Sequence, residues 1–151
     1  MDASTSQPAP HREGVRETIL LVEDHSALLK LVKQILEDAN FKVIAARNAR
    51  EAMRQEAEHE GPIDLLLSDV RMRGKSGPEL AEKLTERRPG MRVVLMSGYP
   101  GGVSLTQHEG WLYIQKPFGP AALVEKIRSA LKEGRSTHSP MALGSSISWP
   151  T

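Results

Sequence analysis

The sequence predicts an α/β domain built on a parallel β-sheet with helices on both faces. Along residues 16–134, short apolar runs of strand length alternate with amphipathic stretches of helix length. The clearest apolar runs contain few polar residues, which is typical of strands buried on both faces of a parallel sheet. Alternation with short connections favours right-handed crossovers between neighbouring strands.

Five segments have the length and apolar character of strands. The first, third and fourth are rich in Leu, Ile and Val, whereas the second and fifth are weaker. In chain order the five are residues 18–22, 41–45, 63–67, 92–96 and 111–114. Five parallel strands with helical crossovers favour the doubly wound, flavodoxin-like order 2-1-3-4-5. In such sheets ligands bind beyond the carboxyl ends of the strands.

The first two helices are predicted from their apolar spacing and their ends. The apolar residues of the first helix fall on one side of it, which we expect to be buried; they are Leu28, Leu31, Val32, Ile35 and Leu36. The segment Asp38-Ala39-Asn40 ends that helix, because Asn can adopt the left-handed backbone conformation that often follows a helix C-terminus. The second helix covers about residues 49–58, with Asn48 as its cap.

Two further helices are predicted from proline and glycine positions. The third begins near Pro78, since proline suits a first helical turn, and stops before Pro89. The last runs from about residue 120 to residue 133, with Gly134 after it.

The helix between the fourth and fifth strands is predicted to be short or irregular. Its segment opens with Tyr99-Pro100-Gly101-Gly102, and glycine costs about 1 kcal/mol relative to alanine inside a helix. Only residues 103–109 remain as a candidate helix, and their two large apolar residues, Val103 and Leu105, fit a helical face poorly.

Length and composition indicate one globular domain with a polar tail at each end. The 151 residues are 39% hydrophobic and 26% charged, which is globular composition. Residues 1–15 and 135–151 are polar and lack periodicity, so we expect flexible tails flanking a domain of residues 16–134.

Charge, cysteine content and hydropathy exclude several classes of function. The net charge is +1, which does not call for nucleic acid as a partner, and the absence of cysteine excludes disulfides and thiolate metal sites. No signal peptide is evident, and no apolar run approaches the roughly 18 residues of a membrane span. We expect a cytoplasmic protein without membrane insertion.

Chemically active residues follow four of the five predicted strands. Glu23 and Asp24 follow the first strand, Asp69 the third, Ser97 the fourth and Lys116 the fifth. Because the carboxyl ends of parallel strands meet at one edge of the sheet, the fold would bring these side chains together. The sequence therefore predicts one site that contains three acids, a hydroxyl group and a lysine.

This residue set suits phosphoryl transfer with a divalent cation. Three adjacent carboxylates repel one another unless a cation compensates, and all-oxygen ligation suits Mg²⁺ or Mn²⁺. We expect the metal to bind through Asp24 and Asp69, with Glu23 acting mainly through water. A carboxylate can also act as a nucleophile and form an acyl phosphate. A lysine and a hydroxyl group could stabilise the transferring phosphoryl group.

The same residues resemble the bacterial response-regulator receiver family over residues 16–134. The motifs that carry the resemblance are Leu21-Val22-Glu23-Asp24, Leu67-Ser68-Asp69-Val70-Arg71-Met72, Met96-Ser97-Gly98-Tyr99-Pro100 and Gln115-Lys116-Pro117-Phe118. The last two motifs are most similar in sequence to receivers of hybrid histidine kinases.

The resemblance implies a role for each matching residue. Asp69 would be the phosphoacceptor, Glu23 and Asp24 the metal-binding acids, and Lys116 the phosphate-contacting lysine. Ser97 and Tyr113 would form the conformational switch, and Arg71 would offer its backbone carbonyl to the metal. The residues to which the resemblance gives a role are Glu23, Asp24, Asp69, Arg71, Ser97, Tyr113 and Lys116.

The resemblance also implies two backbone features and a set of partners. Gly77 would close the loop after the third strand, and the Lys116–Pro117 peptide would be cis. The phosphoryl group would come from a histidine kinase or a histidine phosphotransfer protein, and a downstream protein would receive the signal.

Two other functions remain open at this point. A metal-dependent phosphohydrolase could use Asp69 as nucleophile, but its signature would want a second aspartate at position 71, which is Arg71. A degenerate receiver could serve only as a binding scaffold, but the complete set of acids, serine and lysine argues against this. Each residue alone also has an ordinary explanation as a cap, turn or surface residue.

Overall fold

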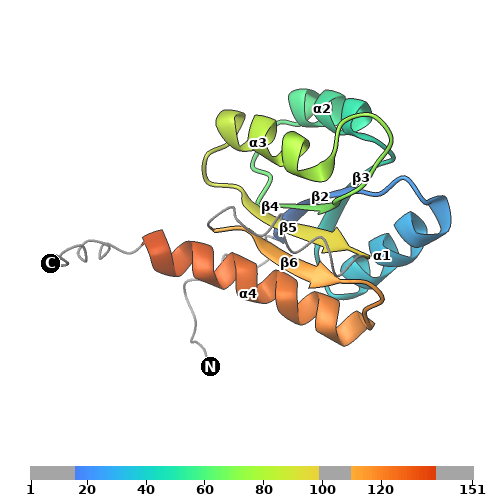
Figure 1. Ribbon diagram of the computed structural model, residues 1–151. Helices are drawn as coiled ribbons and strands as arrows, with labels where there is room; N and C mark the ends of the chain where they lie inside the picture. Colours follow the sequence, from blue (N-terminus) through green and yellow to red (C-terminus); the bar gives the residue numbers. More distant parts are fainter. Residues whose placement is uncertain (1–15, 99–109, 139–151) are drawn as a thin grey trace, which may run out of the picture.

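A computed structural model of the protein describes residues 16–98 and 110–138 (Figure 1). Its centre is one five-stranded parallel sheet with the order β3-β2-β4-β5-β6. The strands are β2 (Thr18–Val22), β3 (Lys42–Ala46), β4 (Leu65–Asp69), β5 (Arg92–Ser97) and β6 (Leu112–Gln115). Numbered along the chain, this is the predicted flavodoxin-like order 2-1-3-4-5, which is thereby confirmed.

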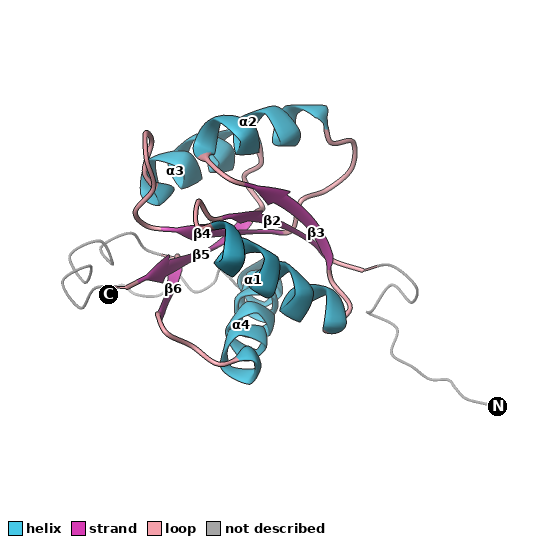
Figure 2. Ribbon diagram, turned by 90° about the vertical axis from the view of Figure 1, so that its right-hand side faces the viewer, coloured by secondary structure: helices cyan, strands magenta, loops and turns pink. Residues whose placement is uncertain are grey.

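Helices cover both faces of the sheet and make a three-layer domain. Helices α1 (Ser26–Asp38) and α4 (Pro120–His138) lie on one face. Helices α2 (Ala49–Glu58) and α3 (Gly77–Arg87) lie on the other face, as Figure 2 shows. The carboxyl ends of all five strands therefore meet at one edge between the two helical layers.

Strand β2 shows how the sheet supplies both hydrophobic cores. All five of its residues are buried. Ile19 and Leu21 join the core under α1 and α4, whereas Leu20 and Val22 join the core under α2 and α3. Successive side chains of a strand point to opposite faces, so both sets must be apolar when both faces are covered.

Side-chain caps define where the helices begin. The Asn48 side chain accepts a hydrogen bond from the backbone N–H of Glu51 at 2.8 Å, which confirms the cap predicted for α2. Ser76 and Glu79 form a reciprocal capping box at the start of α3. His25 caps α1, since its Nδ1 atom accepts from the N–H of Leu28 at 3.3 Å.

Several predicted boundaries were wrong by a few residues. β4 comprises residues 65–69 rather than 63–67, because Asp64 instead serves as the link to the start of β2. Its carboxylate accepts from the Thr18 N–H at 2.8 Å, and its own N–H donates to the Thr18 carbonyl. β3 and β6 each begin one residue later than predicted, and β5 extends through Ser97.

The buried stripe of α1 also differs from the prediction. Leu29, Val32 and Leu36 are its buried residues, whereas Leu31 is 56% exposed. At 3.6 residues per turn, the i, i+3 and i+7 positions face the sheet, and residue 31 falls on the outer side. Leu28 and Ile35 are partly buried at the edge of this stripe.

The last helix is longer than predicted. α4 continues through Gly134 to His138, so four residues assigned to the C-terminal tail belong to it. A single glycine costs a helix only about 1 kcal/mol relative to alanine, and good helix formers surround it here. The predicted fourth helix within residues 103–109 and the tails at 1–15 and 139–151 lie outside the described residues. No helix in the described part of the chain has both the length and the apolar character needed to cross a membrane.

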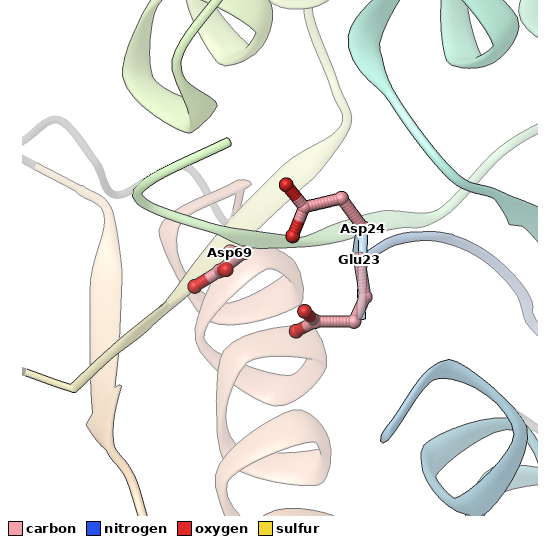
Figure 3. A group of neighbouring side chains, drawn as sticks. All are labelled: Glu23, Asp24 and Asp69. Atoms are coloured by element: carbon pink, nitrogen blue, oxygen red, sulfur yellow. The ribbon is translucent and has the colours of Figure 1, made fainter. Parts of the chain in front are cut away.

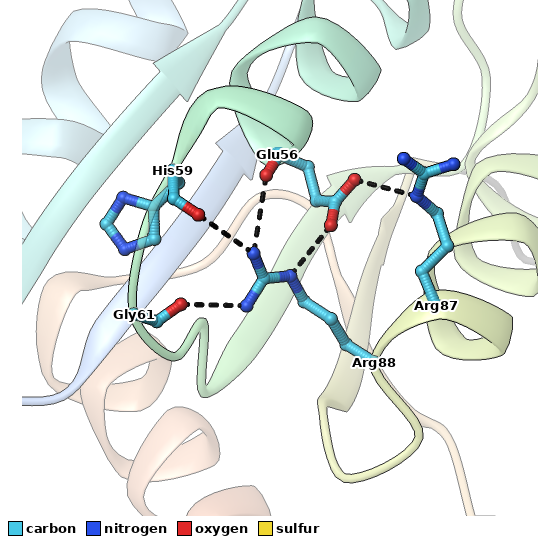
Figure 4. Close-up of polar contacts among 5 residues, drawn as sticks. All are labelled: Glu56, His59, Gly61, Arg87 and Arg88. Carbon is cyan, nitrogen blue, oxygen red and sulfur yellow. Dashed lines mark hydrogen bonds and ion pairs between the residues drawn. The ribbon is translucent and has the colours of Figure 1, made fainter.

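A buried ion cluster joins α2 to the end of α3. The Glu56 side chain is 6% exposed, and its two carboxylate oxygens accept from Arg87 Nε and Arg88 Nε at 2.9 Å each. Arg88 also donates to the backbone carbonyls of Glu56, His59 and Gly61 (Figure 4). One guanidinium group thus satisfies carbonyls at the end of α2 and in the loop that follows it.

Arg88→Met should be far more destabilising than Arg87→Met. Arg88 removal leaves buried Glu56 with Arg87 as its ion-pair partner and takes one donor from each of three carbonyls, of which the Glu56 carbonyl keeps the His59 N–H. This loss should cost about 3 kcal/mol. Arg87 is 51% exposed, so its loss should cost about 1 kcal/mol or less. Urea denaturation of both variants measures the difference, and equal losses would contradict the role given to Arg88.

Candidate functional site

The carboxyl edge of the sheet carries the predicted acidic residues. Glu23 and Asp24 directly follow β2, and Asp69 is the last residue of the adjacent strand β4. Oxygen atoms from the three carboxylates lie within 4.8 Å of one another. Figure 3 shows Glu23 and Asp24 extending from the end of β2 beside Asp69. The fold therefore brings the adjacent pair Glu23 and Asp24 next to Asp69, which follows 45 positions after Asp24 in the chain.

Lys116 supplies the positive charge of this edge. Its Nζ atom lies 3.1 Å from Asp69 Oδ1 and 3.3 Å from Glu23 Oε1. The Lys116–Pro117 peptide is cis, as expected. The Lys116 backbone N–H donates to the Ser97 carbonyl at 2.8 Å, which ties the lysine to the end of β5. The ammonium group is thus shared between two of the three carboxylates.

The two acids after β2 have different surroundings. Glu23 is 1% exposed, and besides Lys116 it accepts a hydrogen bond from the His25 backbone N–H at 3.1 Å. Asp24 is exposed, and its Oδ2 atom accepts from the Arg73 backbone N–H at 3.4 Å. Asp24 is therefore the more accessible ligand, while Glu23 is held in place beneath it.

Burial and neighbouring charges shift the ionisation of the central pair. Burial raises the pKa of Asp69, and the negative charge of Glu23 raises it further, although Lys116 acts in the opposite direction. Burial alone would lower the pKa of Lys116, but the carboxylates of Asp69 and Glu23 raise it overall. The lysine thus stays charged at neutral pH, while ionised Asp69 lacks full compensation.

Gly77 allows the loop after β4 to approach the acidic residue. A Cβ atom at this position would overlap the backbone carbonyl oxygen of Asp69. The Gly77 N–H donates to the Val70 carbonyl at 2.9 Å, which closes the loop. The Ser68 hydroxyl donates to the Asp69 carbonyl at 2.9 Å. Only glycine fits this closure, in agreement with the role expected for Gly77.

Ser97, Tyr113 and Arg71 lie at or near the ends of the strands on the Asp69 side of the sheet. Ser97 ends β5, and half-buried Tyr113 lies on β6 opposite Leu95. Because side chains two residues apart share a face of the sheet, Ser97 and Tyr113 face the same helical layer. Tyr113 packs against the core under α2 and α3, and burial raises its pKa. Arg71 is exposed in the loop two residues after Asp69.

Sequence reasoning did not identify three contributors to this site. His25 holds Glu23 through its backbone and caps α1, and the only signal was its position directly before the apolar stripe. Arg73 binds Asp24 through a backbone N–H, and Ser68 binds the Asp69 carbonyl. His25 and Arg73 bind the acids through their backbone N–H groups, which every residue except proline has. Their identity in the sequence therefore does not indicate these contacts.

The donor set fits a hard divalent cation. The three carboxylates offer only oxygen ligands, and exposed Asp24 keeps one side open to solvent. Mg²⁺ favours such oxygen sites and usually retains several waters. Asp24 and Asp69 would hold the ion directly, with Glu23 behind them. Such an ion would supply charge compensation for the acids and for a bound phosphoryl group.

Acids and a lysine at the carboxyl edge of a 2-1-3-4-5 sheet define the class of signalling receiver domains, and comparison with known proteins agrees. The family model of the response regulator receiver domain matches residues 19–128. The chain therefore belongs to the response regulator receiver domain family, whose members act in two-component signalling.

Relatives and solved structures extend this assignment. The transcriptional regulatory protein GlrR of Escherichia coli is 30% identical over 118 residues, which cover 76% of this chain and 26% of that protein. A receiver domain protein from Methanospirillum hungatei has a TM-score of 0.72 and 33% identity, over 81% of this chain and 98% of that one. The receiver domain of the hybrid histidine kinase CckA has a TM-score of 0.66 and 32% identity, over 76% and 98%. The chain thus spans about a quarter of the length of GlrR but nearly all of the solved receiver domains.

Asp69→Asn should stabilise the metal-free protein. Folding raises the Asp69 pKa above its ordinary value of 3.8. Ionisation therefore lowers stability as the pH rises through the folded-state pKa. The variant should gain roughly 1 kcal/mol at neutral pH. Urea denaturation in the presence of EDTA measures this gain, which should disappear in acid, where wild-type Asp69 is protonated.

Glu82→Gln is the matched control, because Glu82 is exposed on α3 and its change should alter stability by less than about 0.5 kcal/mol. Marked destabilisation by Asp69→Asn would show that the carboxylate has a structural role that outweighs its repulsion with Glu23.

Proposed function

We propose that this domain accepts a phosphoryl group on Asp69 from a histidine kinase or a histidine phosphotransfer protein. The observation that carries the proposal is the position of Asp69 beside Lys116 and two further acids, with Nζ 3.1 Å from Oδ1. Its partners would act in the cytoplasm, and its output would pass to a downstream protein. The receiver is a signalling domain that would support its own phosphorylation and dephosphorylation rather than a conventional enzyme.

The transfer itself needs few groups from the protein. A carboxylate oxygen of Asp69 would attack the phosphorus atom, the phosphorus–nitrogen bond of the donor phosphohistidine would break, and the released imidazole would take up a proton from solvent. Lys116 would move its ion pair from the carboxylate to a phosphoryl oxygen. Asp24, Asp69 and the Arg71 carbonyl would hold a Mg²⁺ ion. The bound ion would lower the repulsion between the acids and the incoming phosphoryl group.

The outer surface of α1 supports a protein as the donor. Leu31 is the exposed large hydrophobic residue of the described chain, at 56% exposure. It lies in the second turn of α1, the helix that begins two residues after Asp24. An exposed apolar side chain on the helix that follows the acidic pair offers a contact for a docked helix.

Phosphorylation with a small-molecule donor tests the proposed chemistry. Acetyl phosphate with MgCl₂ should give a phosphoprotein that intact-mass measurement detects, and EDTA should prevent it. Asp69→Asn should give none, whereas Asp38→Asn, which changes an exposed aspartate on α1, should behave as wild type. Lys116→Met should reduce the rate by about tenfold to a hundredfold, which corresponds to the loss of one charge-assisted contact.

The same assay separates the other functions. Release of phosphate that depends on Asp69, at many turnovers per protein and without phosphorelay to a partner, would indicate a phosphohydrolase. An unmodified protein and unconsumed donor would indicate a binding scaffold. Phosphorylation that persists in Asp69→Asn would contradict the proposed acceptor.

We further propose that Ser97 and Tyr113 transmit the phosphorylation signal. Phosphoryl oxygens on Asp69 would attract the Ser97 hydroxyl, and Tyr113 would then turn inward on the same face of the sheet. The proposal rests on the shared face of the two side chains and on the link from Lys116 N–H to the Ser97 carbonyl. A local charge would thus bias a two-state element.

Tyrosine NMR signals test this switch. The chain has two tyrosines, so Tyr99→Phe leaves Tyr113 as the sole reporter. Addition of beryllofluoride, a phosphate mimic, with Mg²⁺ should shift the Tyr113 ring signals, and Ser97→Ala should remove most of the shift. Unchanged ring signals in a protein that binds the mimic would show that the output uses another surface.

A further inference from the structure

A groove outside the acidic site separates the start of α2 from the loop between β4 and α3. It has a volume of about 850 Å³, and none of the three acids lines it. One wall consists of residues at the start of α2, and the other consists of loop residues and the first turn of α3. The lining residues used below are Asn48, Arg50, Met53, Arg73, Lys75 and Glu79. We call this hollow the α2 groove.

Positive charge outweighs negative charge in the lining of the α2 groove. Arg50, Arg73 and Lys75 are exposed, and their side chains make no ion pair with the part of the chain that the structure describes. They come from two separate elements. Glu79, the carboxylate in the lining, accepts from the Ser76 N–H in the capping box at 2.9 Å. The lining therefore carries three positive charges and one negative charge. The cationic rim is therefore free to bind an anion.

Other cations near the groove are paired, which distinguishes this rim. Arg47 and Arg54, on either side of Arg50 in the chain, both lie within 4.0 Å of Glu51. The floor between the cations is partly apolar, since it includes half-buried Met53. Positive groups around a small apolar floor complement a chain that carries carboxylates and at least one apolar side chain.

We propose that the α2 groove binds an acidic segment of a partner protein. Carboxylates of that segment contact Arg50, Arg73 and Lys75, and an apolar side chain packs on Met53. Nucleic acid fits less well, because the described lining has no aromatic side chain on which a base could stack. This binding goes beyond the proposed phosphoryl transfer and does not require Asp69.

The groove and the acidic site share one loop. The Arg73 side chain lines the groove, while its backbone N–H binds Asp24 Oδ2 at 3.4 Å. A partner segment on Arg73 therefore contacts a residue whose backbone is hydrogen-bonded to Asp24, an expected metal ligand. This position places the acidic segment of the partner next to the phosphorylation edge without entering it.

Fluorescence anisotropy with the full chain tests the proposal. The probe is a fluorescein-labelled peptide with four glutamates around one leucine. Arg50→Glu and Lys75→Glu should each weaken binding about threefold to tenfold, as expected for exposed ion pairs that become repulsive. Lys132→Glu makes the same charge change on α4, which covers the other face of the sheet, and should leave binding unchanged. Higher salt should weaken binding, and Asp69→Asn should not.

Further results distinguish the proposed binding from its alternatives. Replacement of the peptide leucine by serine should weaken binding, and amide shifts on peptide addition should map to Arg73, Gly74 and Lys75. Equal losses in Lys132→Glu, or no binding of the peptide at low salt, would overturn the proposal. Tighter binding of a single-stranded oligonucleotide of the same charge would overturn the assignment to an acidic protein segment. Peptide binding should persist in Asp69→Asn. A failure of peptide binding is therefore distinguishable from a failure of phosphorylation.

Discussion

Helices bury both faces of the central sheet, and this burial limits where polar residues can lie. Every residue of β2 and β4 is buried, so these strands cannot carry solvated polar groups along their length. Polar chemistry is left to the positions where strands end. The crossover helices make all strands parallel, so their carboxyl ends meet at one edge. Acids and the lysine gather there because the layers exclude them elsewhere.

The acidic edge is organised by an imbalance of charge. Three carboxylates face one ammonium group, which lies between Glu23 and Asp69. The remaining negative charge favours a cation or protonation of Asp69. Backbone contacts hold this arrangement in place, since Gly77 permits the loop to close against Asp69 and His25 N–H holds Glu23. The excess negative charge at this edge therefore favours the binding of a cation.

The layer of α2 and α3 carries two charged assemblies with opposite character. At the ends of these helices, the Glu56 carboxylate is buried and its charge is compensated by Arg87 and Arg88. At their beginnings, Arg50, Arg73 and Lys75 surround a groove in which positive charge outweighs negative charge. The first assembly uses charge to join elements, because buried ions need partners. The second leaves charge exposed for a partner.

The sequence by itself determined the fold class, the strand order and the identity of the acidic and basic residues. Apolar runs and helix caps such as Asn48 are local signals, so they can be recognised without coordinates. Tertiary structure alone decided that Lys116 is shared between Glu23 and Asp69 and that Leu31 is exposed. It also decided that Arg50 and Lys75 line one groove. These features depend on distances between residues far apart in the chain and on which side of a helix meets the sheet. Sequence spacing does not contain either quantity, because packing of whole layers sets both.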